Sequence, residues 1–327
     1  MNKIKEHPLV KKVGINRVIL MGVLLLMYVV FSIVSPTFLS YSRILSALNY
    51  AYFLGFLALG VTFVIATGGI DFSVGPVMFC AALISGQLLT KAGVPLGLCL
   101  LIAILVGFLF GVFNGVLVAY AGIPPFITSM AGMMIAKGVG SVATKTQSIS
   151  WPQITDAAGW YRNLIKIDIG SFTFPVGLVI LLAVAVICAV VLNKTLPGRY
   201  ILCLGSNKEA VRLSGINVKR WEMLAYIICG TLAGVAAIFY VGAYTTVQPG
   251  LGDTFNNDAI ASCVMGGTSM AGGIASISGT VIGTMVIALL QEGIMAMGFQ
   301  KDYQYVITGI IVVISVCLDV RSKMRKN

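Results

Sequence analysis

Long apolar stretches recur along the whole chain and constrain its fold more than any other feature. A helix needs about 20 apolar residues to cross a bilayer, and ten segments approach that length. Hydrophobic residues make up 58% of the chain and charged residues 10%, which excludes an ordinary soluble domain. The expected spans are residues 18–34, 49–67, 74–90, 96–119, 125–143, 173–192, 223–243, 257–272, 276–297 and 303–320.

The environment of these segments dictates their secondary structure. Backbone groups inside a bilayer must be bonded internally, so we expect an all-α, polytopic membrane protein of about ten transmembrane helices, with residues 1–327 forming one domain. Glycines spaced by four residues favour close helix packing. Gly-rich segments 106–123 and 278–294 are weakly similar and run in opposite directions. They indicate an inverted five-helix repeat, or a chance similarity of two glycine-rich helices.

Basic residues predict the orientation. Of 22 Lys and Arg, five lie in residues 1–17, six in 193–222 and four in 321–327. Ten spans with both termini inside would place all three groups in the cytoplasm, as the positive-inside rule expects. The net charge of +11 therefore reflects membrane topology and contact with anionic lipid, and we expect no nucleic-acid partner.

An acidic residue interrupts the apolar pattern at Asp71, among three nearby glycines in the segment TGGIDFSVG. A carboxylate at membrane depth is costly and usually faces a cavity or a partner. Glycines there indicate a broken helix, as in many transporters. Ser73 and Asp71 are therefore candidates for a gate. The alternative is a short cytoplasmic turn in which Asp71 caps the next helix.

Two hydrophilic segments stand out. Residues 144–172 are expected outside and contain Trp151, Trp160 and Tyr161. They predict either an anchor at the membrane interface or a docking surface for an external partner.

The second segment is the cytoplasmic loop 193–222. Ser206 or Asn207 is expected to cap a short helix beginning at Lys208, and Gly215 to end it. Glu209 and Arg212 would share one face of that helix. A helix this short has marginal stability in water. It would persist only when docked on a partner or lying on lipid headgroups.

Three motifs resemble the membrane permeases of ribose-type simple-sugar ABC importers. They are Thr67–Gly75, the loop PGR…GSNKEA…LSGIN within 197–217, and DAIA…MGGTSMAGG within 258–273. The resemblance covers essentially the whole chain, with Phe72 and Met270 standing where the family more often has Leu.

The resemblance implies a permease subunit in the bacterial inner membrane. Its expected partners are two cytoplasmic ABC ATPase subunits, an extracytoplasmic sugar-binding protein, and a second permease copy or close relative. It also implies that the helix near 206–216, with Ser206, Asn207, Lys208, Glu209, Arg212 and Gly215, couples to the ATPase. No Gly-Lys dipeptide occurs, so the chain has no Walker A motif and any ATP hydrolysis belongs to another chain.

Two other classes of function compete with an ATP-driven permease. An ion-driven carrier would use Asp71, Lys137, Asp258 and Glu292 as a relay, but it leaves the cytoplasmic loop and the motifs unexplained. A membrane enzyme would need clustered His, Cys or carboxylates. The single His7 and seven scattered cysteines provide no such cluster, and we expect neither a metal nor a cofactor.

Polar and aromatic residues in spans near the expected cavity are candidates for sugar contact, because hydrogen bonds and aromatic faces hold sugars. Each could equally satisfy a neighbouring helix backbone. The candidates are Asn49, Asn114, Phe126, Tyr244, Gln248, Asn256 and Asn257.

Overall fold

Helices dominate the structure, a computed structural model that describes residues 15–324 except 171 and 301. His7 and the basic residues before position 15 lie outside the described residues. The long helices are α3 (Ile15–Val34), α4 (Tyr41–Ala66), α5 (Val74–Lys91), α6 (Leu96–Ala119), α7 (Pro125–Ala143), α8 (Val176–Lys194), α11 (Val218–Ala243), α13 (Ile277–Ala296) and α14 (Asp302–Met324). Shorter helices are η1 (Pro36–Leu39), η2 (Gly159–Leu164), α9 (Leu196–Ser206), α10 (Lys208–Leu213) and α12 (Asp253–Met265).

Eight described helices are long and apolar enough to cross a membrane, namely α3 to α8, α11 and α13. This confirms an all-α polytopic membrane protein. The chain differs from the expected span over 257–272, because α12 has 13 residues and ends at Met265. The next two residues are glycines, and Gly267 has a φ of +91°, which a helix cannot continue. The count of ten spans and the inverted repeat stay predictions.

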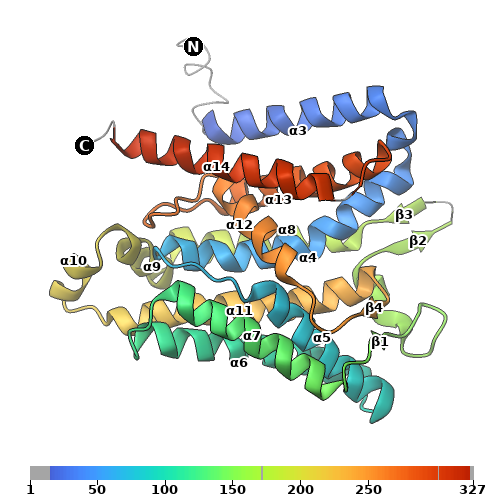
Figure 1. The fold of residues 1–327 in the computed structure, drawn as a ribbon, viewed down its shortest axis with the longest axis horizontal. Coiled ribbons are helices and arrows are strands. Elements are labelled where there is room, and N and C mark those ends of the chain that lie inside the picture. Colours follow the sequence, from blue (N-terminus) through green and yellow to red (C-terminus); the bar gives the residue numbers. More distant parts are fainter. Residues whose placement is uncertain (1–14, 171, 301, 325–327) are drawn as a thin grey trace.

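The molecule has two distinct ends (Figure 1). At one end lies α10, and there α3 begins and α14 ends. We call this the α10 end. At the opposite end lie two small antiparallel strand pairs, β1 (Ile149–Ser150) with β4 (Thr246–Val247) and β2 (Ile167–Ile169) with β3 (Phe172–Phe174). We call this the hairpin end.

The core is built on α4. Its most apolar stretch is 89% buried, against 11% for α3 at the periphery. Small residues let its neighbours approach closely: a Cβ built on Gly107 of α6 would lie 2.3 Å from the carbonyl oxygen of Gly230 in α11. A Cβ on Gly283 of α13 would lie 2.2 Å from the carbonyl oxygen of Ser262 in α12. The glycines spaced by four residues are therefore sites of close helix packing, as the sequence predicts.

Two aromatic residues of the 144–172 segment are not interfacial anchors. Trp151 is 2% exposed and donates its indole N–H to the carbonyl oxygen of Ala82 in α5, at 3.2 Å. The Tyr161 side chain is fully buried, and this burial raises its pKa to about 12. Both side chains fasten the segment to the bundle, whereas Trp160 is 53% exposed. Residues far apart in sequence bury them, which local composition does not reveal.

Candidate functional site

The chain breaks between α4 and α5, and Asp71 lies buried in that break. After α4 ends, residues 67–73 run back toward the middle of the bundle before α5 begins (Figure 1). The Asp71 Oδ1 atom accepts hydrogen bonds from the Ser73 backbone N–H at 2.8 Å and from the Ser73 hydroxyl at 2.6 Å. The Asn114 amide of α6 donates to that hydroxyl at 2.8 Å. Asp71 thus fixes the backbone at the start of α5, as in the capping interpretation, while its role as a gate stays a prediction.

We call Asp71, Ser73, Asn114 and Cys229 the Asp71 cluster, since the Cys229 thiol of α11 also contacts the carboxylate. All four side chains are buried, and the space beside Asp71, Ser73 and Asn114 is too small for a water molecule, so that Asn114 Oδ1 accepts no hydrogen bond from any described residue. The protein itself therefore satisfies this carboxylate.

Asn256 joins the broken segment to α12. Its Oδ1 atom accepts from the Gly75 N–H at 2.7 Å, and its amide donates to the Phe72 carbonyl oxygen at 2.5 Å. The Phe72 ring stands edge-on to the Phe126 ring of α7, with centroids 5.7 Å apart. Asn256 thus holds the starts of two helices together, which is the backbone-satisfying role the sequence left open.

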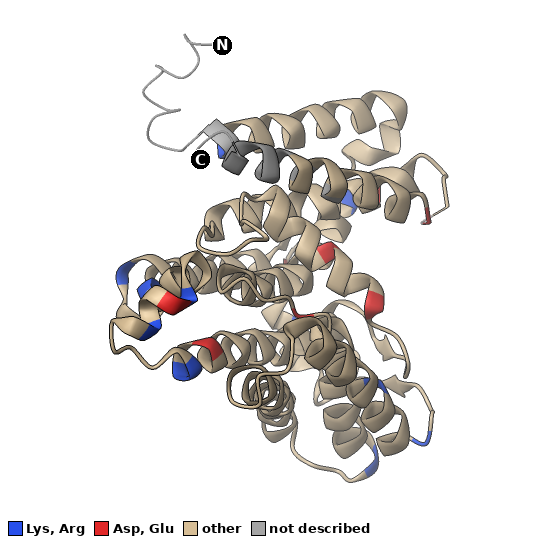
Figure 2. Cartoon of the chain, turned by 60° about the vertical axis from the view of Figure 1, so that its left-hand side comes forward, with Lys and Arg blue, Asp and Glu red and all other residues tan. Residues whose placement is uncertain are grey.

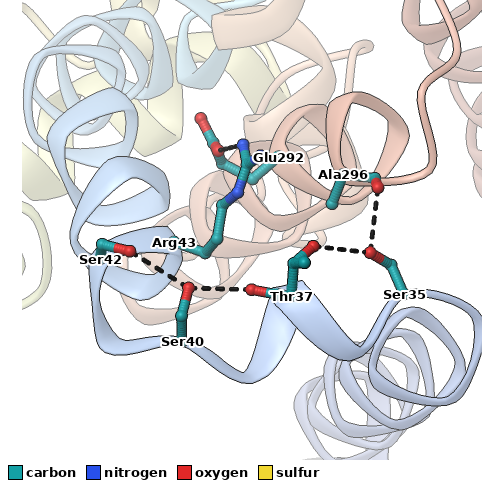
Figure 3. Close-up of polar contacts among 7 residues, drawn as sticks. All are labelled: Ser35, Thr37, Ser40, Ser42, Arg43, Glu292 and Ala296. Carbon is teal, nitrogen blue, oxygen red and sulfur yellow. Dashed lines mark hydrogen bonds and ion pairs between the residues drawn. The ribbon is translucent and has the colours of Figure 1, made fainter.

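A cavity of about 330 Å³ opens among α4, α11, α12 and α13 toward the hairpin end. We call it the hairpin-end cavity. Asn49 and Tyr244, two of the predicted contact residues, both line it. The Arg43 guanidinium lies 3.7 Å from the Glu292 carboxylate, beside the polar chain of Ser35, Thr37 and Ser40 (Figure 3).

The acidic residues in and near the spans have different hydrogen-bond and ion-pair partners. Asp258 accepts hydrogen bonds from the Tyr50 hydroxyl at 2.5 Å and from the Gln304 amide at 3.1 Å. Lys137 of α7 pairs with Asp253 at the start of α12. Asp71 is bound to Ser73 and Glu292 lies beside Arg43, so the four residues named for an ion relay are found with different partners.

The short helix expected in the 193–222 loop is present as α10. The Asn207 side chain accepts from the Ala210 N–H at 2.9 Å and caps it, whereas Ser206 belongs to α9. Arg212 pairs with Glu209 at 2.6 Å on the exposed face, and Gly215 follows with a φ of +76°. Charged residues gather around α10 and the start of α11 (Figure 2).

Two contacts tie α10 to the rest of the bundle. Lys208 Nζ lies 2.8 Å from both carboxylate oxygens of Glu222, in the first turns of α11. Just before α10, Gly205 fits against the carbonyl oxygen of Ala66 and the backbone nitrogen of Gly273. The Gly273 N–H itself donates to Ala66 at 3.0 Å. The helix α10 and the residues just before it therefore contact α11, the end of α4 and the loop after α12.

The structure gathers only part of the predicted pathway. Asp71, Ser73 and Asn114 share one cluster, Asn256 and Phe126 flank it, and Asn49 with Tyr244 lies at the cavity. Gln248 and Asn257 are exposed and join neither. Sequence reasoning missed Gln291 and Phe255 at the cavity and the Lys208–Glu222 pair. Only the tertiary fold brings these residues together.

Comparison with known families identifies the class of protein. Residues 43–316 match the model of a family described as branched-chain amino acid transport system / permease component. The chain belongs to this family of transport permeases.

Several curated relatives cover nearly the whole chain. It is 31% identical to the ribose import permease protein RbsC of Escherichia coli (strain K12), over 90% of this chain and 91% of that protein. It is 33% identical to the fructose import permease protein FruG of Bifidobacterium longum (strain NCC 2705), over 83% and 80%. It is 30% identical to the galactose/methyl galactoside import permease protein MglC of E. coli (strain K12), over 100% and 99%. No solved structure matches the chain significantly.

Proposed function

We propose that this protein is the membrane permease of an ATP-driven importer that carries a simple sugar into the cytoplasm. The observation that carries this proposal is the alignment of 90% of the chain with ribose import permeases. The fructose and galactose relatives widen the substrate class to pentoses and hexoses. Two cytoplasmic ATPase subunits, an extracytoplasmic sugar-binding protein and a second permease copy or close relative complete the transporter.

The α10 end faces the cytoplasm in this proposal. The basic residues around α10 support that orientation, because Lys and Arg are enriched in cytoplasmic loops. It places both chain termini inside and the hairpin end outside, where the binding protein delivers sugar.

We assign α10 as the helix that receives the movement of the ATPase. It presents Leu213, 78% exposed, with the Glu209–Arg212 pair, while Val211 packs inward at 6% exposure. The Lys208–Glu222 ion pair then passes a displacement of α10 to α11. Gly205 passes it to the end of α4 and to the loop after α12.

Substitution of Gly215 tests this assignment. Gly215→Val places a β-branched residue at positive φ and should displace the exit from α10, although no neighbouring atom lies within 4 Å of the added Cβ. The variant should insert in the membrane but lose ATPase association and ATP-dependent uptake. Gly215→Asn is the matched control, because Asn tolerates this backbone conformation and should retain most activity.

The measurements are co-purification of the ATPase and sugar uptake in vesicles carrying the whole transporter. Binding-protein docking should be unchanged in both variants. Normal ATPase binding and uptake in Gly215→Val would contradict the coupling role of α10. Uptake driven by an ion gradient without ATP would overturn the proposed function itself.

A further inference from the structure

The hairpin-end cavity has the form of a small-molecule site within a single permease chain. Its volume of about 330 Å³ lies at the lower end of the range for ligand pockets, roughly 300–1,000 Å³. Aromatic rings form its walls: Phe53 packs edge-on against Tyr240, Tyr244 and Phe255, with centroids 5.1 to 5.9 Å apart. These contacts hold the rings in fixed orientations, so the walls are formed in advance.

One polar atom in this cavity lacks a partner. Gln291 is 5% exposed, and its Oε1 atom accepts no hydrogen bond from any described residue. Of the buried polar atoms in this condition, it is the one whose residue borders the hairpin-end cavity. An unmet buried acceptor lowers the stability of the protein, and a donor entering the cavity would remove that cost. Asn49 adds a second amide to the same lining.

The charged groups at the cavity balance each other. Glu292 lines it, and Arg43 from the first turn of α4 lies 3.7 Å from that carboxylate (Figure 3). Because the two charges compensate, the cavity offers no net charge to attract an ion. Amide groups, a compensated ion pair and aromatic faces together favour a neutral molecule with several hydroxyl groups and an apolar ring face.

We infer that the hairpin-end cavity binds one neutral, ring-sized polyhydroxylated molecule, with Gln291 and Asn49 as its hydrogen-bonding residues. The inference rests on the proposed function and adds to it a binding site inside each permease chain, on the side from which sugar arrives. The donor that meets Gln291 Oε1 is then a sugar hydroxyl, and the rings of Phe53 and Tyr244 bound the space that the sugar ring fills.

Protection of an introduced thiol tests the site directly. Ser46 lines the cavity and is half-buried, so S46C should react with an added maleimide. The transporter complex is purified in nanodiscs without the binding protein, and labelling is followed with ribose, fructose, galactose or leucine at millimolar concentration. At least one sugar should slow labelling of the new thiol several-fold. Cys203, exposed near the α10 end, serves as the internal reference and should react at an unchanged rate.

A second variant separates binding from folding. Combining S46C with Gln291→Leu removes the amide while nearly keeping the side-chain volume, so about tenfold more sugar should be needed for the same protection. Gln147→Leu makes the same chemical change at an exposed loop position and should not alter protection. In the absence of sugar, each combined variant must first be labelled at the same rate as S46C alone, which establishes that the cavity is intact.

The outcomes distinguish the cavity from the proposed function. ATP-dependent sugar uptake together with unprotected S46C would overturn the cavity site and leave the proposed function standing. Protection by leucine but by no sugar would overturn the assigned ligand class. Absence of uptake for every sugar would count against the proposed function, while protection by a sugar in the same preparation would still support the cavity site.

Discussion

The Asp71 cluster and the hairpin-end cavity both bury polar side chains inside an apolar bundle, yet they treat those side chains in opposite ways. Asp71 receives two hydrogen bonds from Ser73, and its surroundings exclude even one water molecule. Gln291 has an acceptor with no described partner beside a volume of about 330 Å³. Each site contains one amide oxygen without a described partner, Asn114 Oδ1 in the cluster and Gln291 Oε1 at the cavity, but of the two sites the cavity alone has room for a donor to reach it.

We assign the two sites different roles, structure to the Asp71 cluster and transport to the hairpin-end cavity. A charge at membrane depth is tolerated when fixed partners surround it, and it then holds backbone in an unusual path. Leaving a neutral amide unpaired costs less free energy than leaving a charge unpaired, so the amide can stay without a partner until a ligand binds. We therefore expect substitutions that remove the acceptor at Asp71 to lower stability, and substitutions at the cavity to change transport with little loss of stability.

The largest effect should follow Asp71→Leu. The change leaves the Ser73 N–H and hydroxyl without their acceptor in a dry environment, at a cost of about 1–3 kcal/mol for each unpaired group. The purified permease should unfold at a markedly lower temperature, and uptake should be lost.

Asp71→Asn is the matched control for this charge. It keeps an oxygen that can accept from Ser73, so folding should be largely preserved while uptake falls. Equal stability of the two variants, measured by thermal unfolding in detergent, would show that the cluster is not a structural element. Wild-type uptake in both would make Asp71 a bystander.

A smaller loss of stability should follow Gly75→Ala. A Cβ at this position would lie 2.1 Å from the carbonyl oxygen of Gly252 and 3.0 Å from Asn256 Oδ1, so α5 and α12 must separate. Overpacking of this kind costs about 1–3 kcal/mol. Gly138→Ala in α7 is the control, because no atom lies within 4 Å of its added Cβ. Similar unfolding temperatures for the two variants would contradict tight packing around the Asp71 cluster.

The smallest effect should follow Tyr50→Phe. This variant keeps the ring that lines the cavity but loses the hydroxyl that donates to Asp258, while the Gln304 amide still donates to that carboxylate. Single hydrogen bonds within membrane bundles contribute about 0.6 kcal/mol on average, so stability should fall little. The sugar concentration for half-maximal uptake is the readout that should change. A loss of stability as large as that of Asp71→Leu would remove the contrast between the two sites.

The sequence predicted the Asp71 region well because its signals are local. An acid and three glycines between apolar runs marked the break, and Asn207 with Gly215 marked the ends of α10. Glycines spaced by four residues likewise marked a face of α6 that packs closely against another helix, which the structure identifies as α11. Each of these features depends on residues within a few positions of one another.

The cavity and the short α12 were harder to predict. Asn49 and Gln291 meet only through the packing of α4 against α13, and nothing local distinguishes Gln291 from an amide that bonds a neighbouring helix. The expected span continued through the small residues 266–272, but glycine conformation ends the helix at Met265. Trp151 resembled an interfacial residue because its acceptor, Ala82, lies on another helix.

The unbroken α11 has a mechanical consequence. Its 26 residues carry Glu222 of the Lys208–Glu222 pair near one end and Tyr240 of the cavity wall near the other. Between these residues its backbone lies against Gly115, Gly111 and Gly107 of α6, over a stretch that runs from Met223 to Gly234. At a rise of about 1.5 Å per residue, Glu222 and Tyr240 lie roughly 27 Å apart along the helix. Because α6 supports α11 over much of that length, we expect the two helices to shift together as one stiff rod, so that a displacement at the α10 end would reach the aromatic wall.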